Sequence, residues 1–154
     1  SAAQQGRTGA LNDAAANDGW TLVTQQTAEW NAEKAQQIVQ SVIDSGESFN
    51  VIYAENDDMA KGAVAALDKA NIPHGVGKDV IVMGFDCNKW ALEELLNQNW
   101  NYDGQCNPFQ ASYIDDIIKK IEAGETISEK TIIMDEKGFD ASTITQADVD
   151  QYGI

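Results

Sequence analysis

The sequence predicts an α/β fold with a Rossmann-like, mostly parallel sheet. The first observation is that short apolar runs rich in β-branched residues alternate with longer segments of helical periodicity. The second is the run at 79–86, which is apolar throughout its middle, as in a strand buried on both faces of a sheet. The third is the stretch 49–63, where an apolar strand passes into a helical pattern with almost no loop. A strand that feeds directly into a helix is half of a βαβ unit.

The helical segments share apolar residues at three- and four-residue spacing, and several of them end at a glycine. Gly19, Gly46 and Gly124 occupy such stop positions. Pro108 stands near the start of the helix that it opens, where its missing N–H costs nothing. Helices are therefore expected at 3–18, 32–45, 57–70, 89–97 and about 108–123, with a short polar helix near 145–152.

The strands are expected in the apolar runs between these helices. Most of the runs are short and contain valine, isoleucine or threonine, which favour a pleated, half-buried surface. The run beginning at Asn101 gives a weaker signal because it is largely polar. Strands are expected in order at 20–24, 50–54, 79–86, 101–105 and 131–134.

The composition describes one globular unit and excludes several classes of function. The chain has 154 residues, 43% of them hydrophobic, and a formal net charge of −15, which repels phosphate backbones and argues against nucleic-acid binding. A single histidine and two cysteines without C-x-x-C spacing provide too few ligands for a structural zinc ion. No apolar run approaches the length of a membrane span. Because the chain begins at Ser1, any targeting segment is expected to have been removed or to lie outside this sequence.

Polar or aromatic side chains follow successive predicted strands, where parallel sheets bind their ligands. One carboxylate, two amides and a flat aromatic face suit a sugar, since polar groups bind paired hydroxyls and an indole covers the ring. A structural alternative exists for each residue: a helix cap, a packing residue or a solvated strand edge. Arg7 lies on an otherwise uncharged helix face and is either a ligand donor or a solvated charge. The strand-end residues are Trp30, Asn56, Asp86 and Gln105.

The region 49–86 contains AENDDMAKGAVAAL followed by KDVIVMGFD, and it resembles the C-terminal part of a periplasmic sugar-binding protein of the ribose/galactose type. Lactose-repressor-like regulators share this fold in their ligand-binding lobes. The segment 105–108, Gln-Cys-Asn-Pro, is more similar to the Glu-Cys-Asn-Pro turn of galactofuranose-type solute-binding proteins of ABC transporters. The resemblance extends through essentially all 154 residues. It implies a lobe of the type I periplasmic-binding-protein fold.

The resemblance also implies which residues contact the sugar. In this family an arginine on the first helix binds the sugar, an aromatic residue after the next strand stacks on the ring, and polar residues at three further turns bind hydroxyls. Gln105 stands where the most similar subfamily has glutamate, which leaves the particular sugar open. The implied ligand-binding residues are Arg7, Trp30, Asn56, Asp86, Gln105 and Asn107.

Such proteins have two lobes joined by crossing segments, and the resemblance covers only the later part of one. It implies that residues 1–107 form the C-terminal sugar-binding lobe without its first strand. Residues 108–136 would belong to the N-terminal lobe, and 137–154 would form the last crossing segment and a short helix. The chain is thus expected to be an incomplete fragment whose missing N-terminal portion supplies a central strand between 20–24 and 50–54.

The function implied is non-catalytic binding of a monosaccharide between two lobes and delivery to the membrane permease of an ABC importer. No cofactor is expected. The implied location is extracytoplasmic, either periplasmic or lipid-anchored at the cell surface. One alternative is the effector lobe of a sugar-responsive transcription regulator. An enzyme is a third class, because Asp57, Asp86 and Asp103 offer carboxylates for glycoside hydrolysis, although no spacing singles out an acid and a base.

The two cysteines are expected to form a disulfide. Cys87 and Cys106 follow the ends of strands that should be neighbours in the sheet, which places them within reach of each other. An extracytoplasmic location would permit the oxidation.

Overall fold

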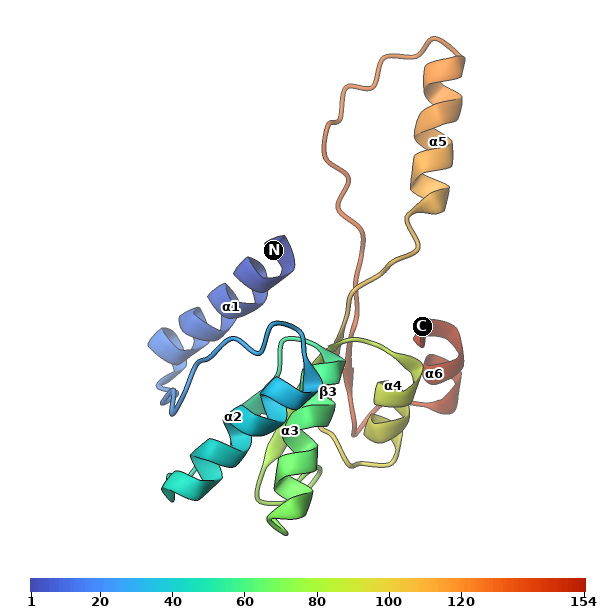
Figure 1. Ribbon diagram of the computed structural model, residues 1–154. Coiled ribbons are helices and arrows are strands. Elements are labelled where there is room, and N and C mark those ends of the chain that lie inside the picture. The colour runs from blue at the N-terminus through green and yellow to red at the C-terminus, as the bar shows by residue number, and fades with distance from the viewer.

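The computed structural model describes residues 1–154 and contains six helices and four strands (Figure 1). The helices are α1 (Ala2–Asp18), α2 (Ala32–Ser45), α3 (Asp57–Lys69), α4 (Lys89–Leu96), α5 (Ala111–Glu122) and α6 (Gln146–Tyr152). The strands are β1 (Val51–Tyr53), β2 (Ile81–Asp86), β3 (Tyr102–Gln105) and β4 (Gly138–Asp140).

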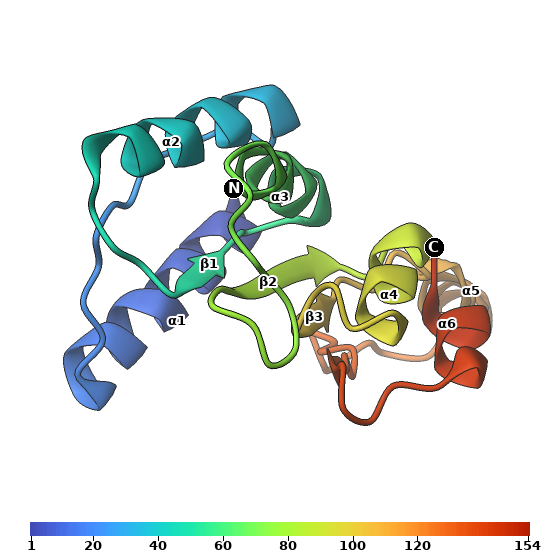
Figure 2. The same cartoon turned by 90° about the horizontal axis from the view of Figure 1, so that it is seen from below.

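The sheet has the order β1-β2-β3-β4. β1, β2 and β3 are parallel, so their carboxyl ends meet at one edge, while β4 runs antiparallel beside β3. Figure 2 shows α2 and α3 on one side of β1 and α1 on the other. The prediction of an α/β fold with a mostly parallel sheet is confirmed.

The core lies between the sheet and the helices α3 and α4. Its largest buried side chains include Leu67 of α3, Val82 of β2, Leu92 of α4 and Trp100. Helix α2 packs on α3, and Gly62 permits the close approach, because a Cβ added there would lie 2.0 Å from the carbonyl oxygen of Ala32. This packed part of the chain positions the carboxyl edge of the sheet.

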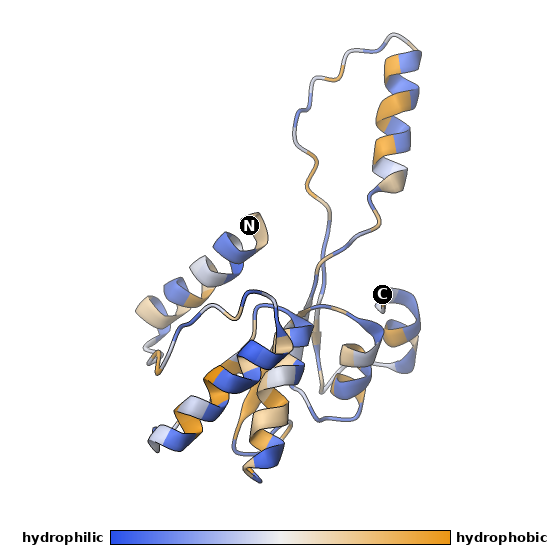
Figure 3. Ribbon diagram, in the orientation of Figure 1, coloured by the Kyte–Doolittle hydropathy of each residue, from blue (hydrophilic) through white to orange (hydrophobic).

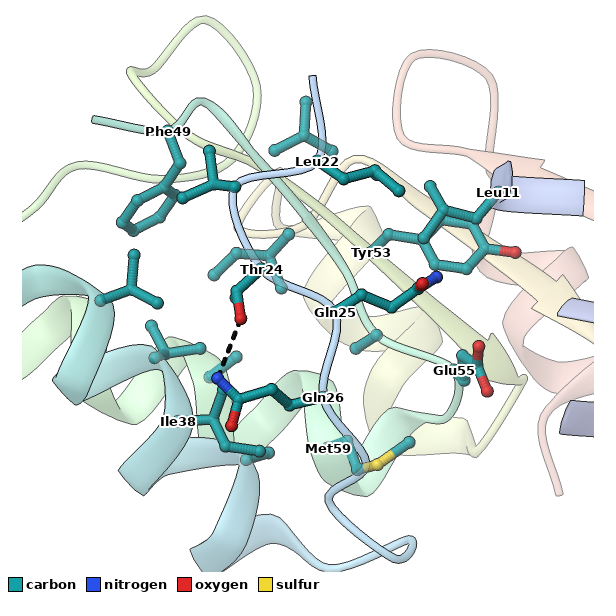
Figure 4. A pocket seen from close by; sticks show the side chains of 18 of the residues that line it. Leu11, Leu22, Thr24, Gln25, Gln26, Ile38, Phe49, Tyr53, Glu55 and Met59 are labelled. Carbon is teal, nitrogen blue, oxygen red and sulfur yellow. Dashed lines mark hydrogen bonds between the residues drawn. The ribbon is translucent and has the colours of Figure 1, made fainter. Parts of the chain in front are cut away.

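The predicted strand at 20–24 does not form. The segment is extended, but residues 20–27 make no backbone–backbone hydrogen bond, because no neighbouring strand lies beside them. β1 pairs with β2 only, so its other edge faces this segment across a groove of about 950 Å³. The groove is lined by apolar side chains such as Leu22, Ile38 and Phe49 (Figure 4). The expectation that 20–24 and 50–54 do not pair with each other is confirmed.

The prediction of a last strand at 131–134 is also wrong. These residues are irregular, and Ile133 is 87% exposed, since no partner strand accompanies them. A strand that was not predicted, β4, follows and pairs with β3. The helix expected from about 108 begins at Ala111, so Pro108 precedes it rather than occupying its first turn.

Helix α5 and the irregular segment after it extend away from the sheet (Figure 1). No residue of α5 is buried, although its hydropathy is strongly divided between two faces (Figure 3). Ile114, Ile118 and Ile121 are exposed and Ile117 is half-buried, as expected of a stripe whose packing partner is absent. Only 24 of the 154 residues are buried, so much of the apolar surface of this chain lacks a neighbour.

Candidate functional site

The carboxyl edge of the sheet carries an ion pair between two of the predicted site residues. Arg7 projects from α1, and its Nη2 donates to Asp86 Oδ1, at the end of β2, over 2.9 Å. The two residues are far apart in the sequence, and the fold brings them together because this part of α1 lies near the end of the strand. The Arg7 side chain is only 12% exposed, so its charge is held in a fixed position rather than solvated.

Neighbouring groups hold the guanidinium in place. Arg7 Nη1 donates to the backbone carbonyl of Glu55, and the guanidinium lies 4.8 Å from the ring centroid of Phe85. The hydroxyl of Tyr53 donates to the backbone carbonyl of Arg7 over 3.0 Å, and Thr8 Oγ1 donates to the Glu55 carboxylate. A guanidinium has five N–H groups, so donors remain for a ligand while the plane of the group is fixed.

Asp86 has an unusual backbone conformation. Its φ is 117° and that of the next residue, Cys87, is 61°, values that non-glycine residues adopt only when their surroundings hold them. Burial raises the pKa of Asp86, and the charge and hydrogen bond of Arg7 oppose this shift. Its side chain is 29% exposed, so the carboxylate remains accessible to a ligand.

Gln105 lies beside Asp86, because the two are register partners at the ends of β3 and β2. Its side-chain carbonyl accepts from the backbone N–H of Lys137 over 3.2 Å. Asn107 lies farther along the connection to α5, where its side-chain oxygen accepts from the N–H of Phe109. Both side chains therefore have structural roles here, and each retains its NH₂ group for other partners.

Asn56 is the N-cap of α3. Its Oδ1 accepts from the backbone N–H of Met59 over 2.9 Å, and the residue is 8% exposed. The cap that the sequence offered as an alternative therefore forms, and the amide nitrogen is the part of the side chain left for a ligand.

Trp30 lies in the turn before α2, with a φ of 61° and 41% of its surface exposed. It lines the groove between 19–30 and β1, together with Thr8 and Glu55, which flank Arg7. Arg7, Asp86 and Gln105 do not line this groove. The structure thus brings Arg7, Asp86 and Gln105 together, while a single cleft that includes Trp30 stays a prediction.

Two of the three carboxylates considered for catalysis, those of Asp57 and Asp103, are not available to a substrate. Asp57 and Asp103 are fully buried beneath the turn that contains Asp86 and Cys87. Asp57 accepts two hydrogen bonds from Asn88 through Oδ2, and burial raises the pKa of both aspartates. Their contacts are internal, which makes them part of the support of the site.

The predicted disulfide is absent, and both cysteines are free thiols. Cys87 is fully buried and directs its Sγ to Asp103 Oδ1 at 3.7 Å, whereas Cys106 is exposed beyond the end of β3. Burial and the nearby carboxylates raise the pKa of the Cys87 thiol above its usual range. The expected bond fails because the two side chains face different environments.

Four residues that the sequence reasoning did not assign to the site contact Arg7 or its partners. The signal for Phe85 was its position directly before Asp86, and the signal for Glu55 was its place in the turn before Asn56. Nothing in the sequence indicated which hydroxyls would reach this region. The four residues are Thr8, Tyr53, Glu55 and Phe85.

The polar side chains at the carboxyl edge of the sheet are better suited to binding hydroxyl groups than to binding a metal ion. No group of three or more histidine, cysteine, aspartate or glutamate side chains is arranged to hold a metal ion. No helix combines the length and the apolar composition that crossing a membrane requires.

An open, mostly parallel α/β sheet with polar side chains gathered at the carboxyl edge defines a ligand-binding domain. The chain belongs to the periplasmic binding protein domain family, whose model matches residues 1–123. It is 30% identical over 128 residues to the fructose import binding protein FruE of Bifidobacterium longum, covering 82% of this chain and 38% of that protein. It is 24% identical over 112 residues to the galactofuranose-binding protein YtfQ of Escherichia coli, covering 71% of this chain and 35% of that protein.

The fold is similar to that of an ABC transporter periplasmic solute-binding protein from Actinobacillus succinogenes with bound D-allose. The TM-score is 0.78 and the identity 25%, covering 97% of this chain and 50% of the other. The family resemblance drawn from the sequence is therefore confirmed. The chain spans at most half the length of each of these relatives.

Proposed function

We propose that this chain is part of a non-catalytic binding protein that holds a monosaccharide between two lobes for an ABC importer. The observation that carries the proposal is the Arg7–Asp86 pair, fixed at the carboxyl edge with ligand-accessible donors and acceptors. A carboxylate next to a guanidinium binds adjacent sugar hydroxyls in a defined orientation, since one accepts and the other donates. Gln105 and the amide of Asn56 add donors at neighbouring positions.

The two-lobed arrangement rests on the length of the relatives and on the unpartnered surfaces of this chain. We assign residues 1–107 to the sugar-binding lobe, 108–136 to the other lobe, and 137–154 to the last crossing segment and helix. The exposed isoleucines of α5 then pack on the N-terminal portion of the same protein.

Closure of the lobes around the sugar would create the form that docks on the membrane permease, at an extracytoplasmic location. FruE is a fructose import binding protein and YtfQ a galactofuranose-binding protein, and these similarities do not favour the transcription regulator.

The test uses the full-length protein that contains this chain. Calorimetric titration with D-fructose, D-galactose and D-allose should show binding of at least one, with no chemical change to the sugar. Asp86→Ala should weaken that binding by about 10- to 100-fold, because a charge-assisted hydrogen bond is lost. Trp30→Ala should weaken it through lost contact with the ring.

Asp79→Ala is the matched control, since it removes an exposed aspartate ahead of β2 at the other end of the strand. The affinity of the Asp79→Ala variant for the sugar should equal that of the wild type. Equal affinities for Asp86→Ala and the wild type would show that Asp86 only supports the turn.

A further inference from the structure

The turn that carries Asp86 is held from below by two fully buried carboxyl groups. Asp103 Oδ1 accepts from the backbone N–H of Cys87 over 3.3 Å, and Asp57 Oδ2 accepts from the backbone N–H of Asn88 over 2.8 Å. Two successive N–H groups of the turn therefore end on two different aspartates, one on α3 and one on β3. No other hydrogen bond holds these two N–H groups.

The turn needs such support because of its backbone. Asp86 and Cys87 both have positive φ, at 117° and 61°, and neither is a glycine. Successive residues in this region relax to other conformations unless contacts hold them. A relaxed turn would move the Asp86 carboxylate away from Arg7.

The two carboxyl groups also lie close to each other. They accept from successive N–H groups of one turn, and Gly84, against which Asp57 packs, is the register partner of Asp103. Asp57 Oδ1 and Asp103 Oδ2 are buried, and neither has a hydrogen-bond partner in the structure. A Cβ at Gly84 would lie 2.7 Å from Asp57 Oδ1, so the glycine leaves room for this oxygen. Two neighbouring carboxylates away from water cannot both remain ionised, whereas one proton between them would give both oxygens a partner.

We infer that Asp57 and Asp103 share one proton and, as a pair, position the 86–88 turn and hence the Asp86 carboxylate for the ligand. They are positioning residues, because neither reaches the surface. As a statement about ligand binding, the inference rests on the proposed function.

Two titratable groups of the turn face the pair. The negative charge of Asp86 at the end of β2 raises the pKa of Asp57 further, whereas the Cys87 thiol donates to Asp103 and lowers the pKa of that carboxyl. The basic side chain of Arg7 is bound to Asp86 and to the carbonyl of Glu55. The pKa of Asp103 is raised to about 9, and burial is the largest cause of this rise.

The sign of the pH dependence follows from this shift. The folded state binds the proton more tightly than an unfolded aspartate, whose pKa is about 4. The pair's contribution to stability is therefore complete below about pH 4 and is lost as the pH rises towards the folded-state pKa of about 9. Above that pH the pair is doubly charged, the turn relaxes, and Arg7 loses Asp86.

The test compares the wild type with Asp103→Asn in the full-length protein. The asparagine keeps an acceptor for Cys87 and offers a permanent N–H to Asp57. Asp103→Asn should retain the NMR signals of the bound Arg7 guanidinium and a constant unfolding temperature from about pH 6 to about pH 10. The wild type should lose both progressively over the same range. Asp79→Asn, which removes one exposed carboxylate elsewhere, should behave as the wild type does.

Identical pH profiles for Asp103→Asn and the wild type would overturn the inference. If Asp103→Asn fails to fold, titration of the Asp103 carboxyl carbon in the wild type decides, and a pKa below about 5 would overturn it. Affinities for D-fructose, D-galactose and D-allose over the same pH range test the link to ligand binding. If no sugar binds at any pH, the proposed function fails, while the NMR profiles still decide whether the pair holds the turn.

Discussion

The Arg7 guanidinium lies 4.8 Å from the centroid of the Phe85 ring while it donates to the carboxylate of Asp86, the next residue, over 2.9 Å. Successive residues of a strand point to opposite faces, but the positive φ of Asp86 turns its side chain back towards Arg7. One arginine is therefore held by two adjacent residues, through a ring face and an ion pair.

Phe85→Leu should weaken sugar binding without removing any polar group of the site. The ring face contributes a cation–π interaction of about 0.5–2 kcal/mol, so the dissociation constant should rise by about 2- to 30-fold. Calorimetry on the full-length protein measures the change. An unchanged dissociation constant would mean that the ion pair with Asp86 alone fixes Arg7, and the unfolding temperature shows whether the variant is folded.

Gly62→Val should destabilise the packing of α2 on α3. A Cβ at this position would lie 2.0 Å from the carbonyl oxygen of Ala32, so the helices must separate, at a cost of about 1–3 kcal/mol. Gly9→Ala is the matched control in α1, since a Cβ there meets no atom within 4 Å. That substitution should stabilise the helix by about 0.5–1 kcal/mol. Denaturant unfolding of both variants measures the difference, and equal midpoints would contradict the close contact.

Ile118→Asp tests whether the stripe on α5 is an interior surface in the full-length protein. Ile118 is 48% exposed here, so in the isolated chain the substitution should leave stability unchanged and reduce self-association. In the full-length protein it should cost about 2–3 kcal/mol, because a buried isoleucine becomes a charge. Ser112→Asp, on the opposite face of the same helix, should be neutral in both. A neutral Ile118→Asp in the full-length protein would show that α5 packs on nothing.

The sequence was sufficient for elements whose contacts are local or lie within this chain. Periodicity predicted 32–45 and 57–70 to within a residue of α2 and α3, which pack on each other, and Gly46 marks the end of α2. The predicted strands at 20–24 and 131–134 fail for a shared reason, since a strand requires a neighbour and neither segment has one. β4 was not predicted because its three residues show no alternation of apolar and polar side chains. The strand forms only because it pairs with the edge of β3.

The site shows the same division. Arg7 and Asp86 were identified individually, and their pairing depends on where α1 lies relative to β2, which no local pattern encodes. The disulfide prediction considered the distance between strand ends but not the directions of the side chains. Asp57 and Asp103 were noticed as carboxylates, but only their burial in the fold reveals them as a pair.

The outer edge of β1 provides a residue-by-residue test of the proposal that a strand is missing from the groove. β1 bonds to β2 through alternate residues: the N–H of Ala54 donates to Met83 and the carbonyl of Asn50 accepts from Ile81. The alternation of a parallel ladder turns the N–H groups of Val51 and Tyr53 towards the groove.

In the isolated chain, the amides of Val51 and Tyr53 should therefore exchange with solvent deuterium much faster than those of Ile52 and Ala54. In the full-length protein all four should be protected, because the N-terminal portion would supply a strand that accepts from the outer pair. Ile52 and Ala54 are the internal control, since they face β2 in either case. Should all four exchange fast in the isolated chain, the chain does not fold without that strand, as buried unpaired groups cost about 1–3 kcal/mol each. Equal protection of the four amides in a monomeric isolated chain would show that nothing is missing from this edge.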